Sequence, residues 1–200
     1  MSGKKRLLVL IAGIALGGCA GSIKSDVTRF HDLGAETPRG TFAIVAHPDQ
    51  RDSLEFKNYS RMLAGQIVRH NLVEVEDPAN ADYVVKFRYG MGAGESTVVS
   101  SPVYGQTGAV YTGPGQIQPT YGIVGTSTST VTTYTRHAEI DMFRRSRVGD
   151  LKKVHETKIV SRGPTDALTQ VLPYMLEAAF KTFPGRSGET ESVVVEMRPD

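Results

Sequence analysis

A single cysteine carries the most distinctive chemistry in this 200-residue sequence, because no other thiol is present. Cys19 follows the tripeptide Leu-Gly-Gly at positions 16–18, and three basic residues at positions 4–6 precede an apolar run over residues 7–16. This run is too short to cross a bilayer, which takes about 20 apolar residues. A basic start, a short apolar middle and small residues at the exit are typical of a secretory signal peptide, which we predict over residues 1–18.

The residues around this cysteine resemble the lipobox of bacterial lipoproteins, in which a leucine and two small residues precede the cysteine. The resemblance implies a diacylglyceryl group on the Cys19 sulfur, a cut before Cys19, and acylation of the new amino terminus, for example with palmitate. Several acyl chains hold a protein stably on a membrane. Ala20, by resemblance to enterobacterial sorting, implies the cell outer membrane, with the protein facing the periplasm. The alternative is a plain secretory signal in which Cys19 is only a small apolar residue.

The charge of the chain depends on the predicted signal peptide. The full sequence has 23 Lys and Arg against 21 Asp and Glu. Removal of residues 1–18 takes away three basic residues and leaves a net charge of −1, with histidine neutral. Nucleic-acid binding needs clustered positive charge, so we expect no nucleic-acid partner. A lipidated Cys19 would leave no thiol for a disulfide, and stability would then depend on an apolar core.

One set of metal-ligating residue types has regular spacing. His137, Glu139 and Asp141 alternate along one predicted strand, where alternate residues lie about 6–7 Å apart and side chains of this length can converge on a metal. Exposed strand faces are, however, routinely charged, and the sequence has no second His-rich element. We therefore predict no metal site.

Two further kinds of chemistry lack the context that they need. Gly90, Gly92 and Gly94 would suit a phosphate-binding loop only if a helix followed, and none is expected there. Nucleophilic catalysis needs a Ser, Thr or Cys beside a base, but there is no G-x-S-x-G turn and the sole cysteine is assigned to lipid. We predict a protein that is not an enzyme, with no catalytic residues and no cofactor. The remaining histidines occur singly and are interpreted as surface or edge residues: His31, His47, His70 and His155.

Two amphipathic segments predict helices. In the first, from residue 54 to about residue 71, apolar residues recur at helical spacing and Ser53 is suited to the N-cap. The second has a cap at Thr165 or Asp166, and Pro173 inside it is expected to kink the helix or to mark where it begins. The apolar stripes consist of Tyr59, Leu63 and Ile67 in the first helix and of Leu168, Leu172, Met175, Ala179 and Phe183 in the second.

Alternating and β-branched segments predict about six strands, at residues 26–31, 41–46, 83–89, 138–142, 153–161 and 193–195. Residues 19–25 are interpreted as a short lipidated tether, and residues 26–200 as a single domain. Two helices among these strands indicate the α+β class. We expect an α/β sandwich whose mainly antiparallel sheet carries both helices on one face.

A register can be predicted for one strand pair. If residues 138–142 and 153–161 form a hairpin around the turn that contains Gly149, Glu139 lies opposite Lys158 and Met142 lies opposite His155. Glu139 and Lys158 would then form a favourable cross-strand pair on the solvent face. The shared buried face would consist of Ala138, Ile140, Met142 and Ile159.

Residues 91–135 differ from the rest of the chain, because they are rich in Gly, Ser, Thr and Tyr and contain one charged residue, Glu95. So few large apolar residues cannot build a core. Two alternatives remain open, a flexible loop or a long β-arm in which residues 96–100 and 126–134 extend the neighbouring strands outward. Uncharged segments of this kind can also self-associate. We treat the insert as the main contact element.

Several motifs between Ser53 and Gly188 resemble an uncharacterised lipoprotein family, that of domain of unknown function 4136. The resemblance implies an envelope lipoprotein with an α/β sandwich, and supplies no catalytic residues. The motifs are Leu54-Glu55-Phe56 with Tyr59, Asp77-Pro78, Ala81-Asp82-Tyr83-Val84-Val85, Ser161-Arg162-Gly163, Leu172-Pro173-Tyr174 and Phe183-Pro184-Gly185.

The expected function is that of an outer-membrane-anchored periplasmic lipoprotein that binds or scaffolds another envelope component. Its partners would be the membrane, through the lipid, and an envelope protein or a second copy. One alternative is a periplasmic small-ligand carrier or enzyme, which needs a closed pocket with converging polar groups. The other is a self-assembling envelope component that associates through residues 91–135.

Overall fold

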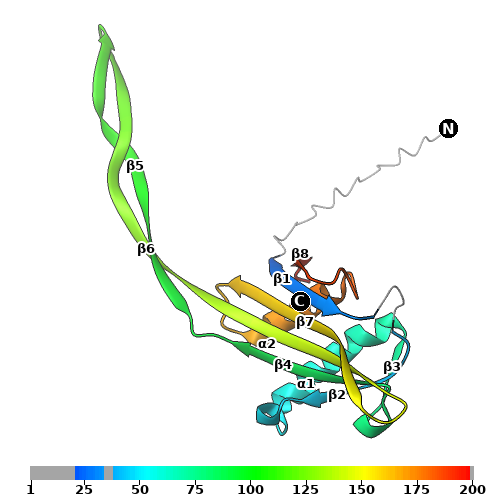
Figure 1. Ribbon diagram of the computed structural model, residues 1–200. Helices are drawn as coiled ribbons and strands as arrows, with labels where there is room; N and C mark the ends of the chain where they lie inside the picture. The colour runs from blue at the N-terminus through cyan, green and yellow to red at the C-terminus, as the bar shows by residue number, and fades with distance from the viewer. Residues whose placement is uncertain (1–20, 34–37, 199–200) are drawn as a thin grey trace, which may run out of the picture.

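The computed structural model describes residues 21–33 and 38–198 (Figure 1). The predicted signal peptide, Cys19 and Ala20 lie outside the described residues. Within the part that is described, no helix is both long enough and apolar enough to cross a bilayer.

One mixed sheet forms the centre of the fold, and the α+β class is confirmed. Strands β2 (Gly40–Ala46), β3 (Leu72–Glu74) and β4 (Tyr83–Met91) lie on one side of the long strand β6 (Gln116–Arg145). Strands β7 (Leu151–Gly163), β1 (Ser22–His31) and β8 (Glu189–Glu196) lie in that order on its other side, and β5 (Glu95–Gly113) pairs with β6. Only the β2–β3 and β2–β4 pairs are parallel among the pairs described.

The sheet has eight strands, so the prediction of about six is wrong. One extra strand is β3, whose three residues are too few to show an alternating pattern. It forms because β2 offers it a free edge: Gly40 pairs with Leu72, and the Val75 amide donates to the Phe42 carbonyl at 2.8 Å. The other is β5, which belongs to the insert.

The first strand begins earlier than expected. Residues 22–25 were predicted to belong to a tether, but they lie in β1 and pair with β8, from Ser22 opposite Glu196 to Ser25 opposite Val193. Ser25 is completely buried. Two residues therefore separate Cys19 from the start of the sheet.

Helix α1 (Leu54–Ile67) has the predicted cap, since the Ser53 hydroxyl accepts a hydrogen bond from the Phe56 amide at 3.2 Å. A 3-10 turn, Val68–His70, continues it to Asn71, whose φ of 64° is left-handed and ends the helix. The buried residues of α1 are Tyr59, Leu63, Ala64 and Ile67.

Helix α2 (Leu168–Phe180) has Ala167 at its N-cap, with no side-chain hydrogen bond, so the predicted cap at Thr165 or Asp166 is wrong. Pro173 lies inside the helix and does not mark its beginning. An internal proline costs about 3 kcal/mol. The helix tolerates it because most of its residues are buried: Val171, Leu172, Met175, Leu176, Ala178, Ala179 and Phe180.

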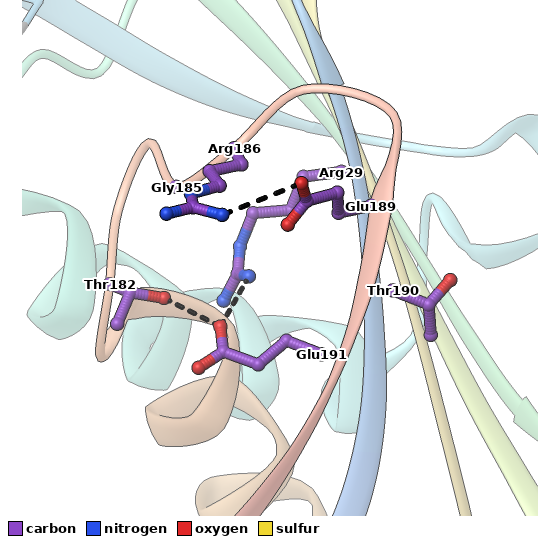
Figure 2. Close-up of a pocket in the computed structure, with 7 residues that line it drawn as sticks. All are labelled: Arg29, Thr182, Gly185, Arg186, Glu189, Thr190 and Glu191. Carbon is purple, nitrogen blue, oxygen red and sulfur yellow. Dashed lines mark hydrogen bonds and ion pairs between the residues drawn. The ribbon is translucent and has the colours of Figure 1, made fainter.

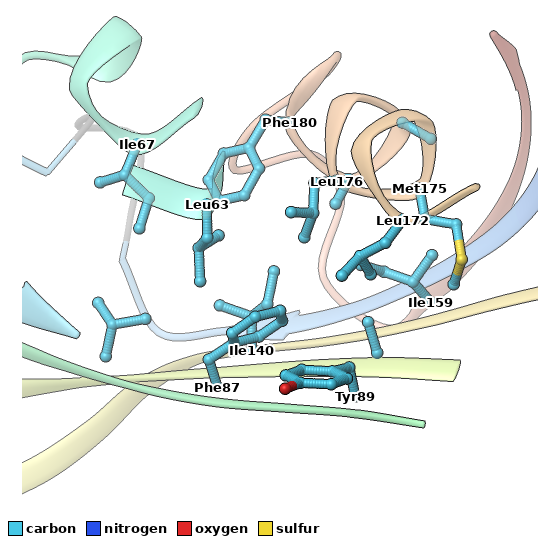
Figure 3. Close-up of a cluster of buried hydrophobic side chains, with 14 of the residues drawn as sticks. Leu63, Ile67, Phe87, Tyr89, Ile140, Ile159, Leu172, Met175, Leu176 and Phe180 are labelled. Carbon is cyan, nitrogen blue, oxygen red and sulfur yellow. The ribbon is translucent and has the colours of Figure 1, made fainter. Parts of the chain in front are cut away.

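The core lies between the two helices and one face of the sheet (Figure 3). Leu63 of α1 and Leu176 of α2 point toward Phe87 and Ile140 on the strands below (Figure 3). All four side chains are buried. Burial of each such side chain stabilises the fold by about 1.5–3 kcal/mol, which makes this layer the main source of stability.

The predicted register of β6 and β7 is confirmed. Glu139 lies opposite Lys158 and Met142 opposite His155. The predicted ion pair is replaced, however, because Arg88 on β4 approaches Glu139 more closely, with 2.6 Å between Nη2 and Oε2. The buried face contains the four predicted residues, Ala138, Ile140, Met142 and Ile159.

The insert forms an extended hairpin, so the β-arm alternative is confirmed and the flexible loop is not. Strand β5 pairs with the first part of β6, from Glu95 opposite Thr133 to Gly113 opposite Gln116. We name residues 95–133 the β-arm and the remaining described residues the body. Figure 1 shows the β-arm standing clear of the sheet and both helices.

Candidate interaction surface on the β-arm

The β-arm begins where β6 loses its neighbours in the body. Its pairing with β7 ends at Tyr134 opposite Gly163, and its pairing with β4 ends at Arg136 opposite Met91. The Gly92 amide, which donates to the Thr135 carbonyl at 2.8 Å, bridges the change from β4 to β5. Beyond this point the described sheet is two strands wide.

Glycines at the base of the β-arm allow strands to pass beneath bulky side chains. A Cβ at Gly90 would lie 2.7 Å from Nε2 of His137, and one at Gly94 would lie 2.7 Å from Cγ2 of Thr132. Real Cβ atoms do not approach other atoms so closely. The Gly-rich run that resembled a phosphate loop therefore lets β4 and the start of β5 pack closely against β6.

Large apolar side chains of the β-arm are exposed to solvent. Tyr104, Tyr111 and Tyr121 are 71%, 75% and 73% exposed. No charged side chain other than Glu95 is present along the arm. So many exposed large apolar side chains on one element are typical of an interaction site. The other exposed large apolar residues of the arm are Val98, Val99, Val103, Val110, Ile117, Ile123, Val124 and Val131.

The outer half of the β-arm gathers aromatic and aliphatic residues on one face. Tyr104 pairs with Ile123, and Tyr111 pairs with Ile117, while Tyr121 lies between them on β6. Alternate residues of a strand share a face, so these side chains lie on the same side. The inner half is rich in Ser, Thr and Val, and there the Ser96 and Thr132 hydroxyls are 3.0 Å apart. The arm therefore offers two chemically different surfaces.

A buried arginine lies on β6 at the base of the β-arm. Arg136 is 1% exposed, and its Nε and Nη2 have no hydrogen-bond partner among the described residues. Burial lowers the pKa of Arg136. Its guanidinium lies against Gly163, where a Cβ would come within 2.6 Å of Nη2. A buried cation without a partner destabilises the fold, so this residue is an exception to the apolar packing around it.

The sequence model of the family described as "Domain of unknown function (DUF4136)" matches residues 33–185. This chain belongs to the DUF4136 family. The match begins before the Ser53 boundary expected from the motifs, and it includes the β-arm. No curated protein matches this DUF4136 chain significantly.

A crystal structure of a PDZ domain protein from Parabacteroides distasonis ATCC 8503, at 2.50 Å resolution, has limited similarity to this DUF4136 chain. The TM-score is 0.44 and the sequence identity is 10%. The alignment covers 88% of this chain but only 40% of that one.

A cavity of about 370 Å³ lies beside the end of α2 (Figure 2). Its buried cation, Arg29, already has partners: Nη1 lies 3.1 Å from Oε2 of Glu191, and Nη2 donates to the Ala178 and Ala179 carbonyls at 3.3 and 3.0 Å. The Thr182 hydroxyl donates to the same Glu191 oxygen at 2.9 Å. These bonds, from Thr182 first and then Arg29, lower the pKa of Glu191. Arg29 therefore caps carbonyls in the last turn of α2, and its own charge is paired with Glu191.

Two histidines that are distant in the sequence form a pair in the body. His31 on β1 lies opposite His155 on β7, and their rings stack with centroids 5.8 Å apart. His155 is 2% exposed, so its interpretation as a surface or edge residue is wrong. Burial first, and then the neighbouring His31, lowers the pKa of His155 to about 4. Only the pairing of β1 with β7 brings the two rings together.

The alternating acidic residues of β6 are neutralised by neighbouring strands. Asp141 Oδ2 lies 2.9 Å from Nζ of Lys153, and Glu139 is paired with Arg88. Among residues 21–33 and 38–198, no group of three His, Cys, Asp or Glu side chains is arranged to hold a metal ion. On this face of the sheet, Glu139 and Asp141 are therefore held by ion pairs to neighbouring strands.

Proposed function

We propose that this chain is an outer-membrane lipoprotein, anchored through Cys19, that binds or scaffolds another component of the cell envelope through its β-arm and catalyses no reaction. The β-arm carries this proposal. It is a long hairpin that no other described element covers, and it has exposed Tyr, Ile and Val side chains with one charge. A surface that is costly to expose to water has a physical reason to be covered by a partner.

The position of the N-terminal end of β1, which follows Cys19, supports a role near the membrane. Ser25 of β1 lies opposite Ser161 of β7, which lies opposite Arg136 at the arm base. The N-terminal end of β1 and the β-arm are therefore at the same end of the sheet (Figure 1). The three Cα-to-Cα steps from Cys19 to Ser22 span at most about 11 Å. A lipid at Cys19 would hold the base of the β-arm close to the bilayer.

The carrier or enzyme alternative has less support. Such a function needs a cavity with converging polar groups that are free to bind a ligand. In the cavity beside α2, Arg29, Thr182 and Glu191 already bind one another.

Deletion of the β-arm tests the proposal. Ser96 and Thr132 are directly opposite, so residues 97–131 can be replaced by an Asn-Gly turn, which favours a tight hairpin. We expect the shortened protein to keep its fold, by circular dichroism and thermal unfolding, and to lose its crosslinked partners in intact cells. Recovery of the same partners from the shortened protein would contradict the proposed role of the arm.

The lipid is tested separately by mass spectrometry of the mature protein. We expect an acylated Cys19 at the amino terminus, and a Cys19→Ala variant that leaves the membrane fraction. An unmodified thiol, or a chain that begins after residue 19, would contradict the anchor.

A further inference from the structure

The β-arm has two strand edges without a partner in the described chain. The outer edge of β6 is free over residues 116–133, about 60 Å at the usual strand rise of about 3.3 Å per residue. The outer edge of β5 is also free, since β2 ends at Ala46 opposite Phe87. Exposed edges carry unpaired N–H and C=O groups that template further strands, and a hairpin of two strands is marginally stable alone.

The two free edges differ in how well they are protected. The β5 edge carries Glu95 and Pro102, and it has one extra residue at each of two register shifts, after Gln106 and after Tyr111. Charges, prolines and bulges are the usual means by which proteins block edge pairing. The β6 edge has one extra residue, Val124, and one proline, Pro119. Over residues 125–133 it contains no charge, no proline and no irregularity.

We propose that the free edge of β6 in the β-arm pairs with the same edge of a second copy of this chain, with the two arms running in opposite directions. The result would be a four-stranded sheet in the order β5, β6, β6, β5. This inference rests on the proposed function, because it names the partner of the β-arm.

The composition of this edge suits pairing with itself. Residues 116–133 have no charge that a second copy would repel, and residues 125–133, which consist of Gly, Ser, Thr and Val, would lie opposite residues nearer the tip of the second arm. Thr and Val favour strands, and pairs of β-branched with aromatic residues across strands are stabilising, which suits Thr and Val opposite the segment that contains Tyr121. A two-fold axis places the same surface on both sides of the contact, as in most symmetric dimers.

The body decides the direction of the arms. Strands β7, β1 and β8 continue the sheet on the side of the free β6 edge, and at about 4.8 Å per strand they extend about 14 Å beyond β6. Two copies with arms in the same direction would bring these strands into the same space. Arms in opposite directions place the two bodies at opposite ends of the contact.

The body also limits the register. Strand β7 occupies the β6 edge from Tyr134 onward, so the arm tip at Gln116 can reach no further than Thr133 of the second copy. The two-fold axis therefore lies between Val124 and Gly125, or nearer the tip. Thr132 of one copy cannot lie opposite Thr132 of the other.

Cysteine crosslinking of the full chain tests this register. The background is the Cys19→Ala variant in detergent, which has no other thiol. Single cysteines replace Gly125, where a Cβ meets nothing within 4 Å, Ile123 on the same edge, and Thr132 near the base. A matched control places the cysteine at Val148, an exposed loop residue of the body. A disulfide needs Cα atoms within about 7 Å, so we expect oxidised dimer from Gly125→Cys or Ile123→Cys at about ten times the yield of the two other variants.

Sedimentation of the Cys19→Ala chain gives a second measurement. We expect a dimer that becomes a monomer when residues 97–131 are replaced by Asn-Gly. Equal crosslinking at all four positions, or a monomer at every concentration, would overturn the inference. If the chain is a monomer whose β-arm still captures another envelope protein, or binds phospholipid vesicles, the second copy is excluded but a binding role for the arm is retained. Failure of the proposed function itself would instead be seen as unchanged partner recovery after arm deletion.

Discussion

Strand β6 passes through two environments along its length. In the body it lies between β4 and β7, and Ala138, Ile140 and Met142 are buried beneath the helices. In the β-arm it pairs with β5, and Tyr121 and Ile123 stay exposed. One end of the strand is thus held by apolar packing and the other by backbone hydrogen bonds. We therefore expect the body to fold without the β-arm, whereas the arm leaves both its faces and its edges for a partner.

The comparison predicts opposite outcomes for similar truncations in the two regions. Phe87→Ala in the core should destabilise the protein by about 3–5 kcal/mol, because it removes a buried ring and leaves a cavity. Ile123→Ala in the β-arm should leave the unfolding of the body unchanged within about 0.5 kcal/mol. Chemical denaturation followed by circular dichroism measures both. A large loss from Ile123→Ala would mean that the arm contributes to the core.

The buried arginine at the base of the β-arm should behave unlike other buried residues of the body. Arg136→Met replaces a guanidinium whose Nε and Nη2 have no partner among the described residues with an apolar side chain of similar length, and we expect a gain of about 1–4 kcal/mol. Arg29→Met is the matched control, since it removes the bonds to Glu191 and to the α2 carbonyls and should be destabilising. Thermal unfolding of both variants shows whether each substitution raises or lowers the stability. A loss of stability in Arg136→Met would show that its guanidinium has a partner in solution.

The stability of the body should depend on pH, whereas the β-arm should respond little to it. The pKa of His155 is about 4 in the folded protein against 6.5 ordinarily, so between these values the unfolded chain binds more protons. Stability is therefore fully present above pH 6.5 and falls as the pH drops toward 4, by about 2 kcal/mol between pH 7 and pH 5.

The control for this titration is His155→Phe, which should remove that part of the pH dependence and keep the contact with Phe183. Denaturation curves at pH 7 and pH 5 measure the difference between the two proteins. The β-arm contains one acidic residue, Glu95, and no basic residue, so a probe placed on the arm should respond little over this range. If the free energy of unfolding of His155→Phe fell between pH 7 and pH 5 as much as that of the unaltered protein, the pH dependence would belong to other groups.

Features that depend on neighbouring residues in the chain were predictable. The Ser53 cap and the helical spacing after it set the start of α1, and the turn at Gly149 set the pairing of Glu139 with Lys158. Both arise because a hydrogen bond or a turn joins residues close in sequence. The family could also be predicted, because its motifs are local runs that survive as packing and turn positions.

Features that depend on distant strands were not predictable. The sequence does not show that β2 would offer an edge to β3, that His31 would stack on His155, or that Arg29 would reach Glu191 and the end of α2. Each contact joins segments whose separation is fixed only when the sheet forms. For the same reason, the sequence did not show that Glu139 would form its ion pair with Arg88 and not with Lys158.

The insert, residues 91–135, depends both on its own composition and on the strands beside it. Its composition alone determined that residues 91–135 could not belong to a core, because they contain too few large apolar side chains. Whether they formed a loop or a β-arm depended on β4 and β6, whose pairing in the body aligns the chain for β5 to continue. Local chemistry sets what a segment can bury, and the sheet beside it decides which strand it meets.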